Sequence, residues 1–198
     1  MYWFYDSTYI LVILAAVISL IASAKVKTTY AKYSRVLSAS GITAEQAAQQ
    51  ILYGAGLSQI PVNQVAGDLT DHYDPRSQTL ALSQTVYGSR SVAAIGVAAH
   101  ECGHAIQDAE NYGPIRLRNS IVPVVNFGSK LSWPLMLLGL LFSFDPLILA
   151  GIWMFALVVA FQVITLPVEF NASRRAVQIL EERGILGEEE LRGAKKVL

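Results

Sequence analysis

Three long apolar segments restrict this 198-residue chain to folds that a lipid bilayer can accommodate. They lie at about residues 3–24, at residues 131–144 (extending back to about residue 121 if an interfacial Asn and Lys are tolerated) and at residues 147–168. A helix needs about 20 consecutive apolar residues to cross the hydrocarbon core. Hydrophobic residues make up 53% of the chain and charged residues 15%, which is too apolar for an ordinary soluble domain. We therefore predict a mainly α integral membrane protein with about three transmembrane helices.

The first apolar segment has two interpretations. A cleaved signal peptide carries basic residues before its apolar run. Here Lys25 and Lys27 follow the run instead. We therefore interpret residues 1–24 as an uncleaved transmembrane anchor.

The positions of the basic residues predict how the chain is oriented. The turn between the second and third segments, Asp145-Pro146, has no basic residue, whereas the other flanks carry Lys25, Lys27, Lys32, Arg35, Arg116, Arg118, Lys130, Arg174 and Arg175. Positively charged loops stay in the cytoplasm. The pattern predicts an external N-terminus, a cytoplasmic region at residues 25–120, a transmembrane hairpin at residues 121–168 and cytoplasmic helices at residues 169–198.

A metal-binding pattern, H-E-x-x-H, lies at residues 100–104. Two histidines four residues apart on a helix have Cβ atoms about 5–6 Å apart. His100 and His104 can therefore reach one zinc ion at about 2.0–2.1 Å. Glu101 lies beside them, where it can accept a proton from water as a general base. The pattern predicts one Zn²⁺ per chain.

The surrounding helix, predicted over residues 92–108, separates polar from apolar side chains. One arc holds His100, Glu101, His104, Gln107 and Asp108, and the opposite side holds Ile95, Ala98, Ala99, Cys102 and Ile106. The alternative, two histidines on an ordinary surface helix, does not explain this separation. Cys102 is predicted to be a core residue, and a single cysteine forms no disulfide within the chain.

A zinc site of this kind needs one more protein ligand. Glu169 is one candidate, because it follows the third apolar segment directly and begins a predicted helix at residues 169–183. It can equally be an interfacial glutamate that complements the N-terminal end of that helix. His72 is the other candidate. The spacing alone does not decide between these interpretations.

The predicted cytoplasmic region also contains a helix and short strands. Thr43 and Gln46 form a capping-box pattern for a helix that ends at Gly54. Apolar alternation at residues 60–65, 69–73 and 78–83, with turn residues between, predicts a small antiparallel sheet. The whole region is thus predicted to be α+β, with a zinc helix beside that sheet.

Several stretches of the chain resemble the YugP-like family of neutral zinc metallopeptidases, prokaryotic membrane proteins distantly similar to the HtpX and CAAX-prenyl proteases. The matching stretches are residues 33–57, 71–76, 91–107 and 167–176. The resemblance implies a gluzincin site in the cell membrane, with His100, His104 and Glu169 as zinc ligands, Glu101 as base and a peptide or protein substrate. HtpX-type proteases carry an aspartate where this chain has Ser173, and related proteins usually continue past residue 198 into another apolar segment.

Further site residues follow from the same interpretation. In resembling peptidases an edge strand before the zinc helix pairs with the substrate backbone, which would here involve Leu80, Ala81 and Leu82; the alternative is an ordinary buried strand. Charge on the carbonyl oxygen of the substrate could be stabilised by one of four residues, between which the sequence does not choose: His72, Tyr87, Arg174 and Arg175.

Other functions stay open at the level of sequence. An intramembrane protease would need the motif inside a full transmembrane helix, but only residues 92–99 precede it as an apolar run. A zinc-binding pseudoprotease, or a membrane scaffold or adaptor that uses residues 25–37 on lipid headgroups, would not turn over substrate. The net charge of zero, without a basic patch, argues against nucleic acid. The sequence identifies neither the substrate nor the oligomeric state.

Overall fold

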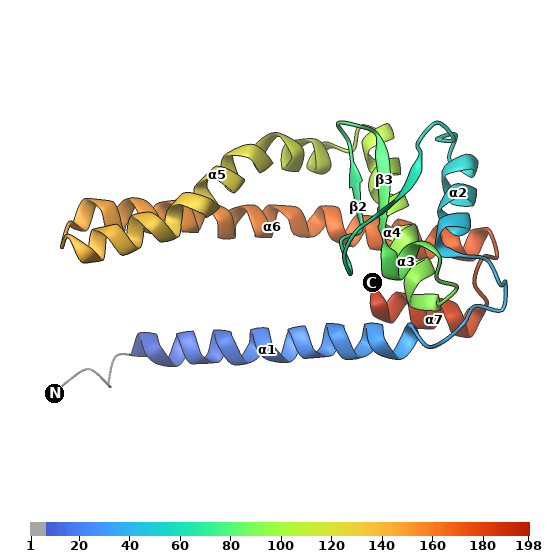
Figure 1. The fold of residues 1–198 in the computed structure, drawn as a ribbon, viewed down its shortest axis with the longest axis horizontal. Helices are drawn as coiled ribbons and strands as arrows, with labels where there is room; N and C mark the ends of the chain where they lie inside the picture. Colours follow the sequence, from blue (N-terminus) through green and yellow to red (C-terminus); the bar gives the residue numbers. More distant parts are fainter. Residues whose placement is uncertain (1–6) are drawn as a thin grey trace.

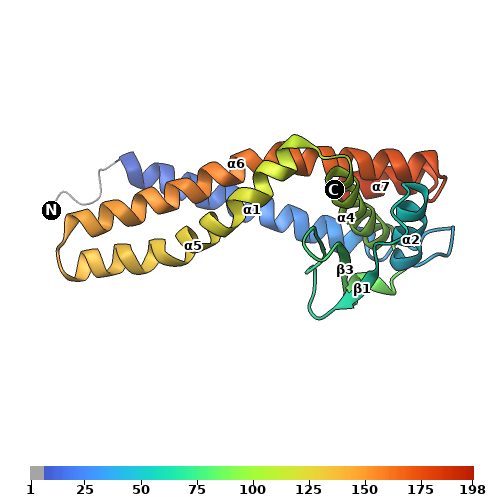
Figure 2. The same cartoon turned by 90° about the horizontal axis from the view of Figure 1, so that it is seen from above.

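The computed structural model describes residues 7–198, so residues 1–6 of the predicted anchor lie outside the described part. Its order of elements is α1 (Ser7–Tyr33), α2 (Ala44–Gly54), β1 (Val62–Val65), β2 (His72–Asp74), β3 (Thr79–Ser83), α3 (Gln84–Tyr87), α4 (Val92–Ala109), α5 (Gly113–Leu141), α6 (Asp145–Glu182) and α7 (Glu188–Val197). The sheet and the shorter helices gather at one end, and α1, α5 and α6 extend from it in the same direction (Figures 1 and 2).

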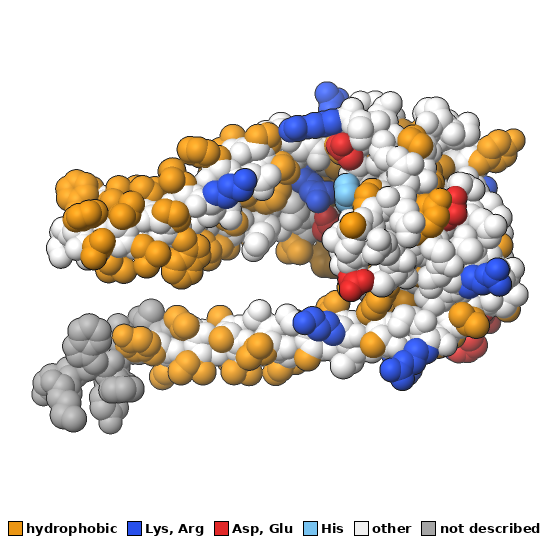
Figure 3. All heavy atoms as spheres, in the orientation of Figure 1, with side chains coloured by type: hydrophobic (Ala, Val, Ile, Leu, Met, Phe, Trp, Pro, Cys, Tyr) orange, Lys and Arg blue, Asp and Glu red, His pale blue; other side chains and the backbone are white. Residues whose placement is uncertain are grey.

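Three helices in the described part are long and apolar enough to cross a membrane, as the sequence predicts. They are α1 from Tyr9, α5 and α6, with 25, 29 and 38 residues. Hydrophobic side chains cover the extended lengths of these helices, whereas charged side chains are concentrated towards the compact end (Figure 3). The free lengths therefore present to their surroundings the surface that lipid requires.

Small residues hold α5 and α6 together as a hairpin. A Cβ atom on Gly139 would lie 2.7 Å from the backbone nitrogen of Ile148, and one on Gly151 would lie 2.8 Å from the carbonyl oxygen of Ser132. Glycine at such positions lets two helix backbones approach closely, which is how helices associate where no hydrophobic effect drives them together. The connection between them is residues 142–144, and Asp145 and Pro146, which were predicted to form the turn, are the first two residues of α6.

Helix α6 is longer than the sequence predicts. The third apolar segment, residues 147–168, and the helix predicted at residues 169–183 form one continuous helix from Asp145 to Glu182. Pro167 lies inside it and removes only one backbone hydrogen bond, and no glycine or charged turn separates the two halves. The same helix therefore carries the apolar segment and the residues beside the H-E-x-x-H motif.

The sheet has three strands in the order β1-β3-β2. The prediction of an antiparallel sheet is wrong in part, because β1 pairs with β3 in parallel and only β2 pairs with it antiparallel. Leu80 and Leu82 of β3 are fully buried, so this strand takes the centre, with the shorter β1 and β2 on either side. Apolar alternation reports which face of a strand is buried and does not report the order of the strands.

Helix α4 lies in the middle of the compact end. Ser91 caps it by accepting a hydrogen bond from the Ala94 N–H, and α2, α6 and α7 pack around it. The predicted apolar side is confirmed, since Cys102 and its neighbours are fully buried in the hydrophobic core. The capping box of Thr43 and Gln46 and the end of α2 at Gly54 are confirmed as well.

The crossing of α4 and α6 is tight because of one glycine. A Cβ atom on Gly103 would lie 2.8 Å from the carbonyl oxygen of Ala172 and 3.2 Å from its Cα atom. Gly103 lies between the two histidines of the motif, and Ala172 lies one helical turn after Glu169. The absence of a side chain at Gly103 therefore sets how close Glu169 comes to the histidines.

We predict that Gly103→Ala destabilises the protein, because α4 and α6 must separate to admit the methyl group. Overpacking of this kind costs about 1–3 kcal/mol, against about 1 kcal/mol that alanine gains over glycine in a helix. The midpoint of thermal unfolding in detergent measures the difference.

The matched control is Gly96→Ala in the same helix. A Cβ atom there would lie 3.5 Å from the Cβ of Ala194, which is an ordinary contact. We expect this variant to be as stable as the wild type or more stable. Equal midpoints for the two variants would contradict the tight crossing at Gly103.

Candidate metal centre

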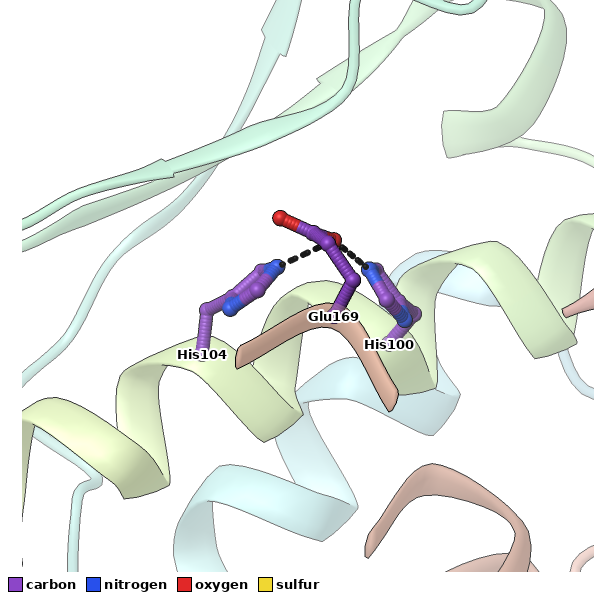
Figure 4. A group of neighbouring side chains, drawn as sticks. All are labelled: His100, His104 and Glu169. Carbon is purple, nitrogen blue, oxygen red and sulfur yellow. Dashed lines mark hydrogen bonds and ion pairs between the residues drawn. The ribbon is translucent and has the colours of Figure 1, made fainter. Parts of the chain in front are cut away.

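Three side chains from two helices converge beside the sheet (Figure 4). His100 and His104 come from α4 and Glu169 comes from α6. The Oε2 atom of Glu169 lies 3.2 Å from Nε2 of His100 and 3.4 Å from Nε2 of His104. One donor atom from each residue lies within 4.8 Å of the other two. The three residues are therefore close enough to hold a metal ion.

The two distances from Glu169 are those expected between ligands of a tetrahedral zinc ion, and the two histidine nitrogens lie within 4.8 Å of each other. Ligand atoms that lie about 2.0–2.1 Å from zinc are about 3.3 Å from one another in a tetrahedron. The separations of 3.2 Å and 3.4 Å from Glu169 to the two histidines agree with that value. The donor set also suits zinc, which accepts imidazole nitrogen and carboxylate oxygen.

The hydrogen bonds of His104 leave its Nε2 atom facing Glu169. Its Nδ1 atom lies 3.0 Å from Oε1 of Gln107, whose amide nitrogen donates to Val168 O and Asn171 Oδ1, both at 2.9 Å. The amide is thus oriented with its oxygen towards His104, and Nδ1 carries the proton. In the neutral ring Nε2 then has a lone pair directed at a carboxylate oxygen. Two acceptors at this distance require either a second proton or a cation between them.

The groups around His104 also change the pKa of its imidazole. Burial lowers the pKa of its imidazole. The hydrogen bond to Glu169 and the negative charge of Glu101 together raise this pKa by more than burial lowers it, so it lies above the ordinary value for histidine. A positive charge is therefore favoured at this position. A bound metal ion supplies that charge without the second proton.

A hydrogen-bonded chain behind His104 joins the two helices. Asn171 Oδ1 accepts from Gln107 and also from Nε of Arg175 at 2.8 Å, and Arg175 pairs with Glu110 at 2.7 Å. Gln107 is fully buried. Such partners fix the orientation of a ligating histidine.

The second histidine and the glutamate have their own supports. Ser173 Oγ lies 3.2 Å from Nδ1 of His100, so a serine hydroxyl is within hydrogen-bond distance of this histidine. Arg118 of α5 lies 3.6 Å from the other oxygen of Glu169, Oε1. Each metal-binding side chain thus has a partner at the atom that faces away from the cluster.

Glu101 is largely buried next to the cluster. Its Oε2 atom accepts a hydrogen bond of 3.1 Å from the backbone N–H of Tyr73 in β2. Burial raises the pKa of its carboxyl group, whereas the positive charges of His104 and His100 act in the opposite direction. A pocket of about 320 Å³ opens in front of His100, Glu101 and Glu169.

Four of the residues predicted to contact the substrate do not belong to this group of three side chains. Arg175 belongs to the chain behind His104, and Tyr87, at the end of α3, packs against the hydrophobic core. Arg174 lines a separate groove between α6 and α7. His72 is exposed on β2, where its Nδ1 atom bonds to Thr70 O at 2.8 Å.

The predicted edge strand is a further correction. β3 pairs with β1 on one side and β2 on the other, so Leu80, Ala81 and Leu82 have no free edge for a substrate. All three side chains are buried. Of the two strands that do lie at the edges of the sheet, β2 contacts the motif helix, through Tyr73 and Glu101. The burial of Leu80 and Leu82 agrees with their apolar character, which the sequence shows. Apolar character alone does not show whether a strand lies at the edge of a sheet.

Sequence reasoning did not assign a role to several residues at this site. Gln107 lies on the predicted polar arc of the motif helix, and this was the available signal for it. Arg118 and Asn171 reach the cluster only through the packing of α5 and α6 against α4. The intramembrane interpretation is not supported, because α4 is packed within the compact end and is outside the three candidate membrane helices of the described part.

Comparison with known proteins places this geometry in a family. Residues 8–198 match the family described as "putative neutral zinc metallopeptidase". The chain belongs to this family. It is also 48% identical over 188 residues to the "putative membrane protease YugP" of Bacillus subtilis (strain 168), covering 95% of the present chain and 84% of that protein. No solved structure gives a significant match. The predicted family is therefore confirmed, and membership of it implies zinc.

We predict that Gln107→Leu weakens zinc binding by about 10–100-fold, the range for loss of a partner that orients a ligand. Leucine has a similar volume but leaves Nδ1 of His104 without an acceptor. Competition with a chromogenic chelator measures the affinity. Gln50→Leu, on the exposed side of α2, is the matched control. Unchanged affinity in Gln107→Leu would show that the chain behind His104 does not position this ligand.

Proposed function

We propose that this protein is a membrane-embedded zinc peptidase of gluzincin type, with His100, His104 and Glu169 as ligands of one Zn²⁺ ion. The observation that carries the proposal is the convergence of these three donor atoms within 4.8 Å, with Glu101 beside them. Family membership supports it independently. The proposed substrate is a peptide or protein.

The chemistry follows from the positions of the side chains. Zinc at this cluster supplies a Lewis acid that activates water and polarises a peptide carbonyl. The Glu101 carboxylate accepts a proton from the water and returns it to the leaving amine as a general base and then a general acid. The hydrogen bond from the Tyr73 N–H holds Oε2 of Glu101, so that the carboxylate keeps one orientation.

The outer edge of β2 is the proposed site for the substrate backbone. Tyr73 directs its N–H towards Glu101 and away from β3, so this edge lies along the motif helix. An extended peptide can pair with such an edge by strand addition. Of the residues proposed to stabilise charge on the carbonyl oxygen, His72 is the one that belongs to β2.

For the membrane arrangement we propose the topology expected from the charges. The N-terminal anchor at residues 1–24 and the hairpin at residues 121–168 cross the bilayer, and residues 25–120 and 169–198 are cytoplasmic. Three sufficiently apolar helices extending in one direction support this arrangement. Glu169 is the first residue after the uncharged segment of α6, so the catalytic site would face the cytoplasm close to the membrane surface.

We predict that Glu169→Ala loses zinc, and that Glu101→Gln keeps one zinc per chain but loses hydrolysis by about 10²–10⁴-fold, the usual contribution of a general base. Metal analysis of detergent-purified protein and cleavage of an unfolded polypeptide measure the two effects. Glu189→Gln, an exposed carboxylate on α7, is the control and should keep both zinc and activity.

The outcomes separate the alternatives. A pseudoprotease would bind zinc in the wild type without cleaving any peptide. A scaffold or adaptor would bind no metal even when zinc is supplied. Full zinc in Glu169→Ala would contradict the ligand assignment and make His72 the next candidate.

The topology predicts which sites a membrane-impermeant maleimide can label in intact spheroplasts. In a Cys102→Ala background, we expect Asp145→Cys in the hairpin turn to be labelled from outside. Glu188→Cys at the start of α7 should be labelled only after lysis, because α7 is proposed to be cytoplasmic. The reverse pattern would show that the site faces the other side of the membrane.

A further inference from the structure

Leu69, which lies beside the candidate metal ligands, has a strained backbone and an exposed apolar side chain. Its backbone has φ of 53°, in the left-handed region that a residue with a branched apolar side chain rarely adopts. Its side chain is also 52% exposed. Glycine or asparagine would satisfy this backbone at less cost. The conformation therefore places an apolar side chain in the open at a position where packing in the core does not require it.

The exposed side chain of Leu69 forms part of the pocket in front of the cluster. Val97 of α4, and Val197 and Leu198 at the end of α7, line the same pocket. These four apolar side chains come from three separate parts of the chain. His100, Glu101 and Glu169 line the pocket too, so its apolar wall lies directly beside the atoms that would act on a peptide bond.

Asp71 and Ser173 complete the lining of the pocket. Asp71 faces the pocket, and Ser83 holds its carboxylate through the backbone N–H at 2.8 Å and through the hydroxyl group. Bound Zn²⁺ would offset the charges of Glu101 and Glu169, so Asp71 is the carboxylate that opposes an acidic side chain in this pocket.

We propose that this pocket binds a large apolar side chain of the substrate, at a residue that flanks the cleaved bond, and rejects an acidic one. The proposal rests on the proposed peptidase function and adds a substrate class to it. A volume of about 320 Å³ corresponds to about ten water molecules, enough for a leucine or phenylalanine side chain. Binding of that side chain buries Leu69, Val97 and the end of α7, and the water released makes binding favourable.

The test compares synthetic peptides that differ only at the residues flanking one bond, with leucine, phenylalanine, serine or aspartate there. Zinc-loaded, full-length protein in detergent should cleave the leucine and phenylalanine peptides with kcat/KM at least about 10-fold above the serine peptide, the discrimination that an apolar pocket supplies. The aspartate peptide should be the poorest substrate.

The decisive variant is Leu69→Asn, because asparagine tolerates the left-handed backbone while removing the apolar surface. We expect unchanged zinc content, an unfolding midpoint equal to or above that of the wild type, and loss of most of the preference for leucine over serine. A purely structural role for Leu69 would change the midpoint and leave the preference intact.

Leu69→Asn removes an exposed apolar side chain and also changes a residue with a left-handed backbone, so each of these changes has its own control variant. Leu37→Asn removes a leucine that is 70% exposed and outside the pocket, and Gln78→Asn changes a distant residue with φ of 48°. Both should keep the preference of the wild type. Equal cleavage of the leucine and aspartate peptides by the wild type, or an unchanged preference in Leu69→Asn, would overturn the pocket assignment. Cleavage of no peptide by zinc-loaded protein would instead overturn the peptidase function and the pocket with it.

Discussion

The close crossing of α4 and α6 at Gly103 is the contact on which the rest of the site depends. Because Gly103 has no side chain, the backbone of Ala172 approaches it directly, and Glu169 reaches Nε2 of both histidines. Gln107 then bonds across the same crossing to the backbone of Val168. A helix pair held a methyl group further apart would lose the donor geometry and this support together, since both depend on one interhelical distance.

Helix α6 also connects the membrane-spanning part to the chemistry. It continues without a break from the apolar segment to Glu169 and on through Asn171 and Ser173, which support the two histidines. In the proposed topology a rigid helix therefore fixes the cluster at a set height above the bilayer. Substrates would be cleaved close to the membrane surface, and the apolar wall around Leu69 would select among the bonds that reach it.

Local patterns account for the parts of the protein that sequence reasoning predicted well. The motif helix, the capping box at Thr43, the burial of Cys102 and the apolar helices all depend on residues close together in the chain. The order of the strands was not predictable in this way, because β1 and β2 both alternate and either could have taken the centre. The side chains that support the histidines were not predictable for a related reason. Glutamine, asparagine and serine are common on protein surfaces, and only the packing of the helices places these ones beside the histidines.

The sequence by itself determined the class of the protein and the chemistry it can attempt. The apolar segments are long enough for helices that cross a membrane, and the spacing of His100, Glu101 and His104 suits one side of a helix, because both are properties of residues close together in the chain. Only the tertiary structure decided that Glu169 meets that face, that β2 rather than β3 borders it, and that Leu69 stands open beside it. These are contacts between residues far apart in the chain, and their distances are set by how closely helices and strands pack.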